Sequence, residues 1–356
     1  MPTRFVFTLV VMAGLLSFVS PTSAQSLLID IPRDSQHAIV SQRVGITDIT
    51  INYHRPLVKG RQVWGKLVPY GEVWRAGANE NTTITFTDPV TIESQPLPAG
   101  VYGLHMIPGE NEWTVIFSKI HTDWGSYTYN PTHDALRVKV KPQSAEMREA
   151  LSYDLDVVNP DSTVATLRWE KLAVPFKIDV NVHDLVRASL PLQLHGGAQY
   201  GWNAWDDAAT YLLSQKYALE DALQYEDSSI GVEKRYDNLL TKSQILDAMG
   251  RKDEAAAAKN QALAAATGRQ LYYYAVSLKS QGKPDEAFDF FRQAATRDPS
   301  DWLVHDGLAR VYSAKGDFEN ALKEMRLSLA GAPDTQKYFP ADMIKMLEAK
   351  KDINQN

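Results

Sequence analysis

The residues best suited to bind a ligand are basic and aromatic, and they gather in two stretches of the N-terminal half. Trp and Tyr present flat faces with a polar edge, and the guanidinium of Arg is a rigid fork of hydrogen-bond donors. Together such side chains can bind a sugar ring or a ligand that carries a carboxylate. The candidates that we select for such a site are Tyr53, Arg55, Arg61, Trp74, Arg75, Asn79, Trp124 and Tyr127.

The same residues have a second interpretation, in which they lock a long loop in place. A loop of roughly 25 residues between strands needs anchors, because ordering a free chain costs conformational entropy. An arginine can stack on a tryptophan and donate to loop carbonyls. We favour this interpretation, and we expect Trp74 and Arg75 to close the loop onto the domain. Asn79 would then cap the turn into a strand that begins near Thr82.

No motif selects catalytic or metal-binding residues. The histidines of this half show neither HxH nor HExxH spacing, and the chain contains no GxSxG and no cysteine. Acids near the aromatic stretches are candidates for a pair of glycosidase carboxylates, but acids in loops usually form turns or face solvent. These acids are Glu72, Glu80, Asp123 and Asp134. We expect no metal and no cofactor, and the catalytic residues stay unassigned.

Alternating apolar residues predict the strands that position these side chains. Turn sequences such as "LPAG" (97–100), "PGEN" (108–111) and "NPDS" (159–162) separate the strands. About eight short strands with such turns imply an antiparallel sandwich or a closed barrel over residues 26–182. The strands that we expect lie within 48–56, 82–86, 100–109, 112–119, 136–142, 151–159 and 162–172.

From residue 201 the pattern becomes helical and repeats every 34 residues. Ala287 and Ala321 occupy equivalent small positions, which lets one helix approach the next closely. Gly282 and Gly316 occupy equivalent turns. This is the tetratricopeptide pattern. We expect two clear repeats, preceded by two degenerate ones, and a groove along which Tyr272, Tyr273 and Phe290 are exposed, unless some of them pack between repeats.

The N-terminal half resembles a bacterial family known only as DUF2911, a domain of unknown function. The resemblance rests on "QRVGITDITINYHRP" (42–56), "KGRQVWGKLVPYGEVWRAGANENTTITF" (59–86), "LPAGVYGLHMIPGENEWTVIFSK" (97–119) and "WGSYTYNPTHDALRVKV" (124–140). It spans essentially the whole β region and implies no activity.

The N-terminus predicts a signal peptide over residues 1–24. Arg4 precedes an apolar run from Phe5 to Phe18, and the small residues Thr22 and Ala24 define cleavage after Ala24. Without cysteine the exported chain has no disulfide and no lipid anchor, which predicts a periplasmic or secreted protein without stable membrane insertion. The net charge of −6 argues against nucleic acid as a partner.

These observations divide the chain into a β domain (26–182), a connector (183–200), helical repeats (201–335) and a partly helical tail (336–356). We interpret the protein as a non-catalytic binding or scaffold protein whose repeats engage a protein partner. The β domain would bind a glycan or another small ligand. The alternatives are a hydrolase of envelope polysaccharide or peptide with its site on the β domain, and a purely structural envelope protein.

Overall fold

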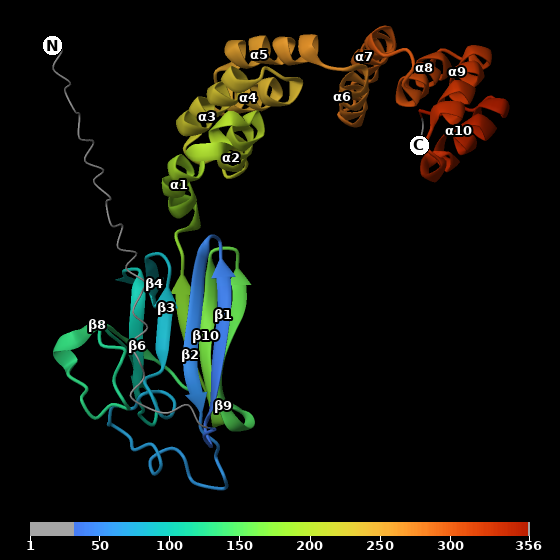
Figure 1. The fold of residues 1–356 in the computed structure, drawn as a ribbon. Helices are drawn as coiled ribbons and strands as arrows, with labels where there is room; N and C mark the ends of the chain where they lie inside the picture. Colours follow the sequence, from blue (N-terminus) through green and yellow to red (C-terminus); the bar gives the residue numbers. More distant parts are fainter. Residues whose placement is uncertain (1–31, 355–356) are drawn as a thin grey trace, which may run out of the picture. The chain divides into compact units, whose positions relative to one another are not determined.

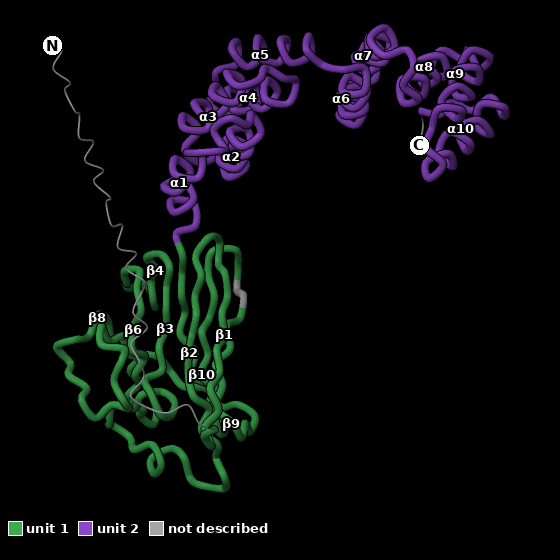
Figure 2. The backbone as a smooth tube through the Cα atoms, viewed as in Figure 1, with its two compact units in different colours: residues 1–180 green, residues 181–356 purple. Residues whose placement is uncertain are grey.

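Figure 1 shows the computed structural model, which describes residues 32–354 except for the side chains at 157 and 158. The predicted signal peptide lies outside the described residues and stays a prediction. The chain forms two compact units, Met1–Val180 and Asn181–Asn356 (Figure 2). The first unit is built mainly of strands and the second of helices.

The first unit contains two antiparallel sheets that do not close into a barrel. The six-stranded sheet has the order β1 (Gln36–Val44), β2 (Thr47–Arg55), β3 (Thr83–Phe86), β6 (Gly100–Ile107), β7 (Trp113–Ser118) and β8 (Asp134–Val140). The four-stranded sheet has the order β5 (Gln95–Leu97), β4 (Val90–Ile92), β10 (Ser162–Asp179) and β9 (Gln143–Asn159). The predicted antiparallel β domain is confirmed, as an open pair of sheets.

The two sheets pack through the alternating apolar residues that the sequence shows. Ring contacts cross between them, from Phe117 on β7 to Phe176 on β10 and from Tyr53 on β2 to Tyr153 on β9. Every residue of β7 is buried, in accord with its continuous apolar sequence. Removing each large ring from water contributes about 1.5–3 kcal/mol to folding.

Three strands have no counterpart among the predicted ones. Strands β4 and β5 have only three residues each, which is too short to show an alternating pattern. Strand β1 pairs along its whole length with β2, although most of its side chains are at least partly exposed. Its place in the sheet therefore depends on backbone pairing more than on burial.

The second unit is an array of helices that pack in consecutive pairs. The pairs are α2 (Trp202–Ser214) with α3 (Leu219–Val232), α4 (Tyr236–Ala248) with α5 (Lys252–Ala265), α6 (Gly268–Ser280) with α7 (Pro284–Arg297), and α8 (Trp302–Ala314) with α9 (Phe318–Gly331). Helix α10 (Tyr338–Glu348) follows the last pair. The two clear repeats correspond to α6–α9, and the two degenerate ones to α2–α5.

Small residues allow the close helix packing that the repeat predicts. Ala287 and Ala321 are both fully buried. At Gly307 of α8 an added Cβ would lie 2.6 Å from the ring of Phe291 on α7, so the two helices meet at a position that admits no side chain. Gly282 has φ +77°, a left-handed conformation that ends α6 without a steric penalty.

The segment that we predicted as a connector without a regular period is mostly helical. Helix α1 runs over Val182–Gln193 and begins at Asn181, whose side chain accepts a hydrogen bond from the backbone N–H of Asp184. Only Leu190 of this helix is buried, and Pro191 lies inside it, which explains the weak helical pattern. None of the helices in the described residues is long and apolar enough to cross a bilayer.

Candidate functional site

The long loop between β2 and β3 is anchored by Trp74. Its backbone N–H donates to the carbonyl of Met106 and its carbonyl accepts from the N–H of Met106, both at 2.8 Å, so the loop joins the edge of β6. The indole Nε1 donates to the carbonyl of Gly77 at 3.1 Å. The ring stacks on Trp169 and meets Trp64 edge to face, with ring centroids 5.9 Å apart in both cases. Trp74 therefore has the anchoring role that we expected.

Three other candidates also direct their polar groups to the protein itself. The hydroxyl of Tyr53 accepts from the backbone N–H of Tyr153 at 3.2 Å. The Nε of Arg55 donates to the carbonyl of Leu151 at 2.8 Å. The Nε of Arg61 donates at 3.0 Å to the carbonyl of Val58, three residues earlier. The first two bonds join β2 to β9, and the third fixes the start of the loop on itself.

Asn79 does not cap the turn into the next strand, so that prediction was wrong. Its side chain donates to the carbonyl of Ser35 at 3.3 Å, 44 residues away in sequence. The turn is held instead by Thr82, whose hydroxyl donates to the carbonyl of Ala76 at 3.2 Å. Asn79 has φ +58°, a left-handed conformation that Asn tolerates better than most residues.

Arg75 does not anchor the loop in the way that we expected. It forms no hydrogen bond and no ion pair within 4 Å with any other described residue, and its Nε is buried. One terminal nitrogen lies 3.3 Å from the position that a Cβ would occupy at Gly125. Burial lowers the pKa of Arg75, and the nearby Tyr127 and Glu80 only partly offset this effect. Arg75 thus keeps its charge beside Gly125 without a partner among the described residues.

An ion-pair network borders Arg75, and the sequence did not indicate it. Oε1 of Glu80 accepts from Arg33 at 2.8 Å, and Oε2 lies 3.4 Å from Nδ1 of His54. Burial opposes the ionisation of Glu80, but hydrogen bonds from its own backbone N–H and from Arg33 outweigh burial and lower its pKa. Burial also lowers the pKa of His54, so this imidazole is neutral at pH 7. The network therefore combines a carboxylate with the Arg33 cation.

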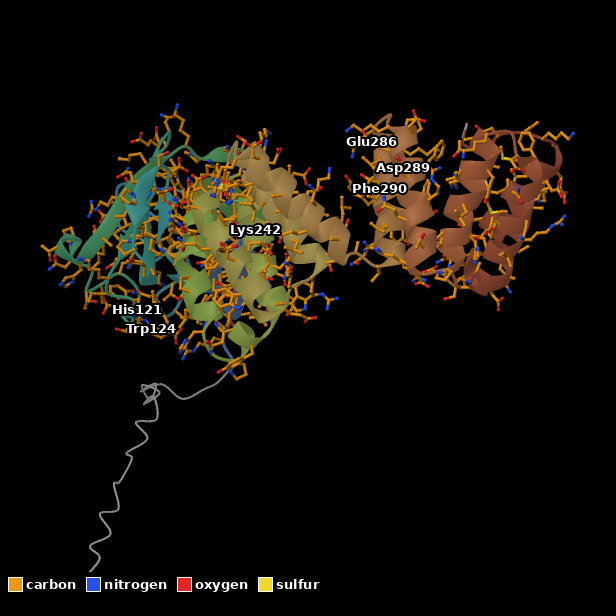
Figure 3. The ribbon with its side chains drawn as sticks, turned by 90° about the horizontal axis from the view of Figure 1, so that it is seen from above. His121, Trp124, Lys242, Glu286, Asp289 and Phe290 are labelled. Atoms are coloured by element: carbon orange, nitrogen blue, oxygen red, sulfur yellow. The ribbon has the colours of Figure 1, made fainter. Side chains whose placement is uncertain are left out.

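The aromatic residues beside this network face solvent. Trp124 is 44% exposed and Tyr127 is 85% exposed. The guanidinium of Arg33 lies over the Trp124 ring at 5.3 Å, and the backbone of Trp124 pairs with that of Glu80. Figure 3 shows Trp124 and His121 together at one edge of the β domain. Arg75, Trp124 and Tyr127 are therefore the predicted site residues that the structure brings together at the surface.

The loop that carries these rings is held by a Ser–His pair. Oγ of Ser126 lies 2.9 Å from Nδ1 of His105. Such a pair contains the atoms of a nucleophile and a base, but burial lowers the pKa of His105 to about 4, far below the value near pH 7 that suits a general base. Asp134, the nearest acid, accepts hydrogen bonds from Tyr129 and Arg137. We therefore assign Ser126 and His105 a positioning role.

No metal centre is evident in the part of the chain that the structure describes. Among residues 32–354, no group of three or more His, Cys, Asp and Glu side chains lies in a geometry that could hold an ion.

A separate, concave site lies in the helical unit. A cavity of about 420 Å³ is lined by Tyr272, Val276, Lys279 and Ser280 of α6, Phe291 of α7, Arg310 of α8 and Phe339 of α10. Arg310 donates to Asp306 at 2.8 Å, and its guanidinium lies 5.7 Å from the ring centre of Phe339. The side-chain ammonium of Lys279 makes no hydrogen bond or ion pair with another described residue.

Of the groove aromatics, only Tyr273 is largely exposed. Its side chain is 58% exposed, whereas Tyr272 is buried and donates its hydroxyl proton to Asp306 at 2.6 Å. Tyr272 is therefore not exposed as predicted. Its partner Asp306 lies 34 residues away in sequence, so no local pattern shows this contact. Phe290 is partly buried and contacts Tyr274 edge to face. In Figure 3 it lies on α7 together with Glu286 and Asp289.

These features define a two-part protein, an open two-sheet β domain followed by tetratricopeptide-like helical repeats. Residues 35–178 match the model of the family described as "Protein of unknown function (DUF2911)". Residues 278–339 match the model of a tetratricopeptide repeat. Both resemblances that the sequence suggested are confirmed.

Several solved structures of tetratricopeptide proteins are similar to this chain. One is YrrB, "a TPR protein with an unusual peptide-binding site", with 15% identity, a TM-score of 0.29, and coverage of 47% of this chain and 87% of the other. MamA has 15% identity, a TM-score of 0.28, and coverage of 41% and 85%. A repeat protein from Parabacteroides merdae has 16% identity, a TM-score of 0.21, and coverage of 48% and 80%. No curated protein matches the sequence.

Proposed function

We propose that this protein is an exported, non-catalytic binding protein whose helical repeats hold a segment of a protein partner. The observation that carries the proposal is the cavity of about 420 Å³ that helices α6, α7, α8 and α10 form together. Its volume lies in the range of roughly 300–1,000 Å³ that is usual for binding pockets. The repeat family supports the same function, because stacked helix pairs create extended concave surfaces that bind partners.

The chemistry of the cavity favours a partner segment with an apolar side chain next to an acidic group. Val276 and Phe339 supply apolar wall, and Val276 is 41% exposed. Burial, followed by the charge of Arg310, lowers the pKa of Lys279. A carboxylate from a partner would stabilise the ammonium form of Lys279, because an opposite charge at short range offsets both effects.

The test compares how much of a protein partner is recovered by affinity purification with the native exported chain and with single surface variants. Val276→Glu introduces a charge into the apolar wall at an exposed position, and Lys279→Glu reverses the charge beside it. Leu192→Glu is the matched control, since Leu192 is 79% exposed on α1 and does not line the cavity. We expect both groove variants to lose a partner that the native chain and the control recover. Equal recovery by all four proteins would contradict the proposal.

Export is the second part of the proposal, and it is supported by the sequence of residues 1–24. The basic residue, the apolar run and the small residues before Gln25 have the order of a cleavable signal. We expect the protein in the periplasmic or culture fraction, with Gln25 as the first residue of the mature chain. Recovery of full-length protein in the cytosolic fraction would refute export.

A further inference from the structure

The backbone of Arg75 is fixed on both sides in sequence, and the Nε of its side chain is buried. Trp74 is bound to β6 by two backbone hydrogen bonds. The carbonyl of Ala76 accepts from the hydroxyls of Tyr153 at 2.8 Å and of Thr82 at 3.2 Å. Because this backbone is already ordered, a ligand that binds the guanidinium does not have to order the loop, which favours affinity.

The protein does not neutralise this guanidinium. A partly buried charge is costly unless it is paired, and structures usually pair buried arginines with carboxylates. Glu80, the acid that acts on Arg75, is already bound to Arg33 and lies against His54. No carboxylate of residues 32–354 lies within 4 Å of Arg75. The surface beside Gly125 therefore carries an uncompensated cation and a second arginine nearby.

Two exposed rings belong to the segment around Gly125, which lies beside this charge. Trp124 precedes Gly125, and Tyr127 lies so close that a Cβ on Gly125 would be 3.0 Å from its ring. Gly125 has φ +72° and no side chain, so nothing on that residue covers the guanidinium. Large exposed aromatic residues are otherwise unfavourable in water, and beside a fixed cation they provide a flat apolar face for a ligand ring.

We propose that Arg75, Trp124 and Tyr127 form a binding site for a ring compound that carries a carboxylate, and that its ligand is a hexuronic acid unit of a polysaccharide. The carboxylate pairs with the guanidinium of Arg75, whose planar donors match its two oxygens. The apolar face of the sugar ring packs on the exposed aromatic rings. This site lies in the β domain, and its test does not depend on the proposed function of the helical repeats.

Calorimetric titration of the full chain with four probes tests the proposal. The probes are glucuronate, tetragalacturonate, glucose and acetate. We expect glucuronate to bind at least tenfold more tightly than glucose, which lacks the charge, and than acetate, which lacks the ring. Tighter binding of tetragalacturonate than of glucuronate would support a polysaccharide unit, whereas equal binding would overturn the assignment to a polysaccharide.

Variants separate a ligand site from a structural lock. We expect Arg75→Gln to weaken glucuronate binding at least tenfold without lowering the melting temperature, because it removes a charge that no described residue pairs. Tyr127→Ala, at a position that is 85% exposed, should weaken binding several-fold and leave the fold intact. Arg43→Gln is the matched control, since Arg43 is an exposed arginine of β1 whose partner is Asp48.

Four results would overturn the proposal. The first is no binding of either uronate at millimolar concentration, and the second is equal binding of glucuronate and glucose. The third is native affinity in Arg75→Gln, or, if that variant does not fold, native affinity in Tyr127→Ala. A preference for acetate equal to that for glucuronate would show a simple anion site and would overturn the assignment of a sugar acid.

Discussion

Glu226 on helix α3 provides a quantitative test of the helical unit. Its side chain is fully buried, and it lies near Asp206 of α2. Burial, followed by the charge of Asp206, raises the pKa of Glu226 from 4.5 to about 9. At neutral pH the carboxyl group is therefore protonated in the folded protein and ionised in the unfolded chain.

The cost to stability follows from this difference in pKa. For an acid with a raised pKa, stability is greatest below pH 4.5 and falls as pH rises toward 9, because unfolding releases a proton. Each pH unit in that window costs about 1.4 kcal/mol, so the cost at pH 7 is about 3 kcal/mol. Glu226→Gln replaces the acid with a neutral group of the same shape, and it should remove this cost.

Thermal unfolding of the full chain, followed by circular dichroism at 222 nm between pH 5 and 8.5, measures the effect on the helices. At pH 7 we expect Glu226→Gln to raise the melting temperature by roughly 6–12 °C, with a gain that grows with pH. Glu220→Gln, at an exposed acid in the first turn of the same helix, should change stability little or lower it slightly. A gain that does not depend on pH, or a loss of stability at pH 8, would refute the reasoning.

Three further predictions concern packing. Trp74→Ala should destabilise the β domain by about 3 kcal/mol, because it removes a stacked ring, and denaturant unfolding followed by tryptophan fluorescence measures the loss. Gly307→Ala should cost about 1–3 kcal/mol, because its Cβ would meet Phe291 at 2.6 Å, whereas Gly231→Ala, with nothing within 4 Å, should stabilise α3. Equal effects of the two glycine changes would contradict this. Ser126→Ala should leave the far-ultraviolet spectrum unchanged and speed proteolysis of the loop after residue 119; unaltered cleavage would argue against its positioning role.

The local pattern of the sequence determined the class of each half. Ala287 and Ala321 are 34 residues apart, and this spacing alone predicts stacked helix pairs, since each repeat packs mainly on its neighbours. Ile49 and Ile51 alternate with polar residues, which places them on the buried face of a strand. These properties depend on residues close together in the chain, and the sequence displays them directly.

Only the tertiary structure decided which side chains remain available to a ligand. Arg55 and Arg75 belong to the same predicted set, but the Nε of Arg55 donates to a carbonyl 96 residues away, whereas no described residue accepts from Arg75. Arg33 meets Glu80 across 47 residues. Such pairs depend on how strands and loops come together, and no local pattern records which donor meets which acceptor.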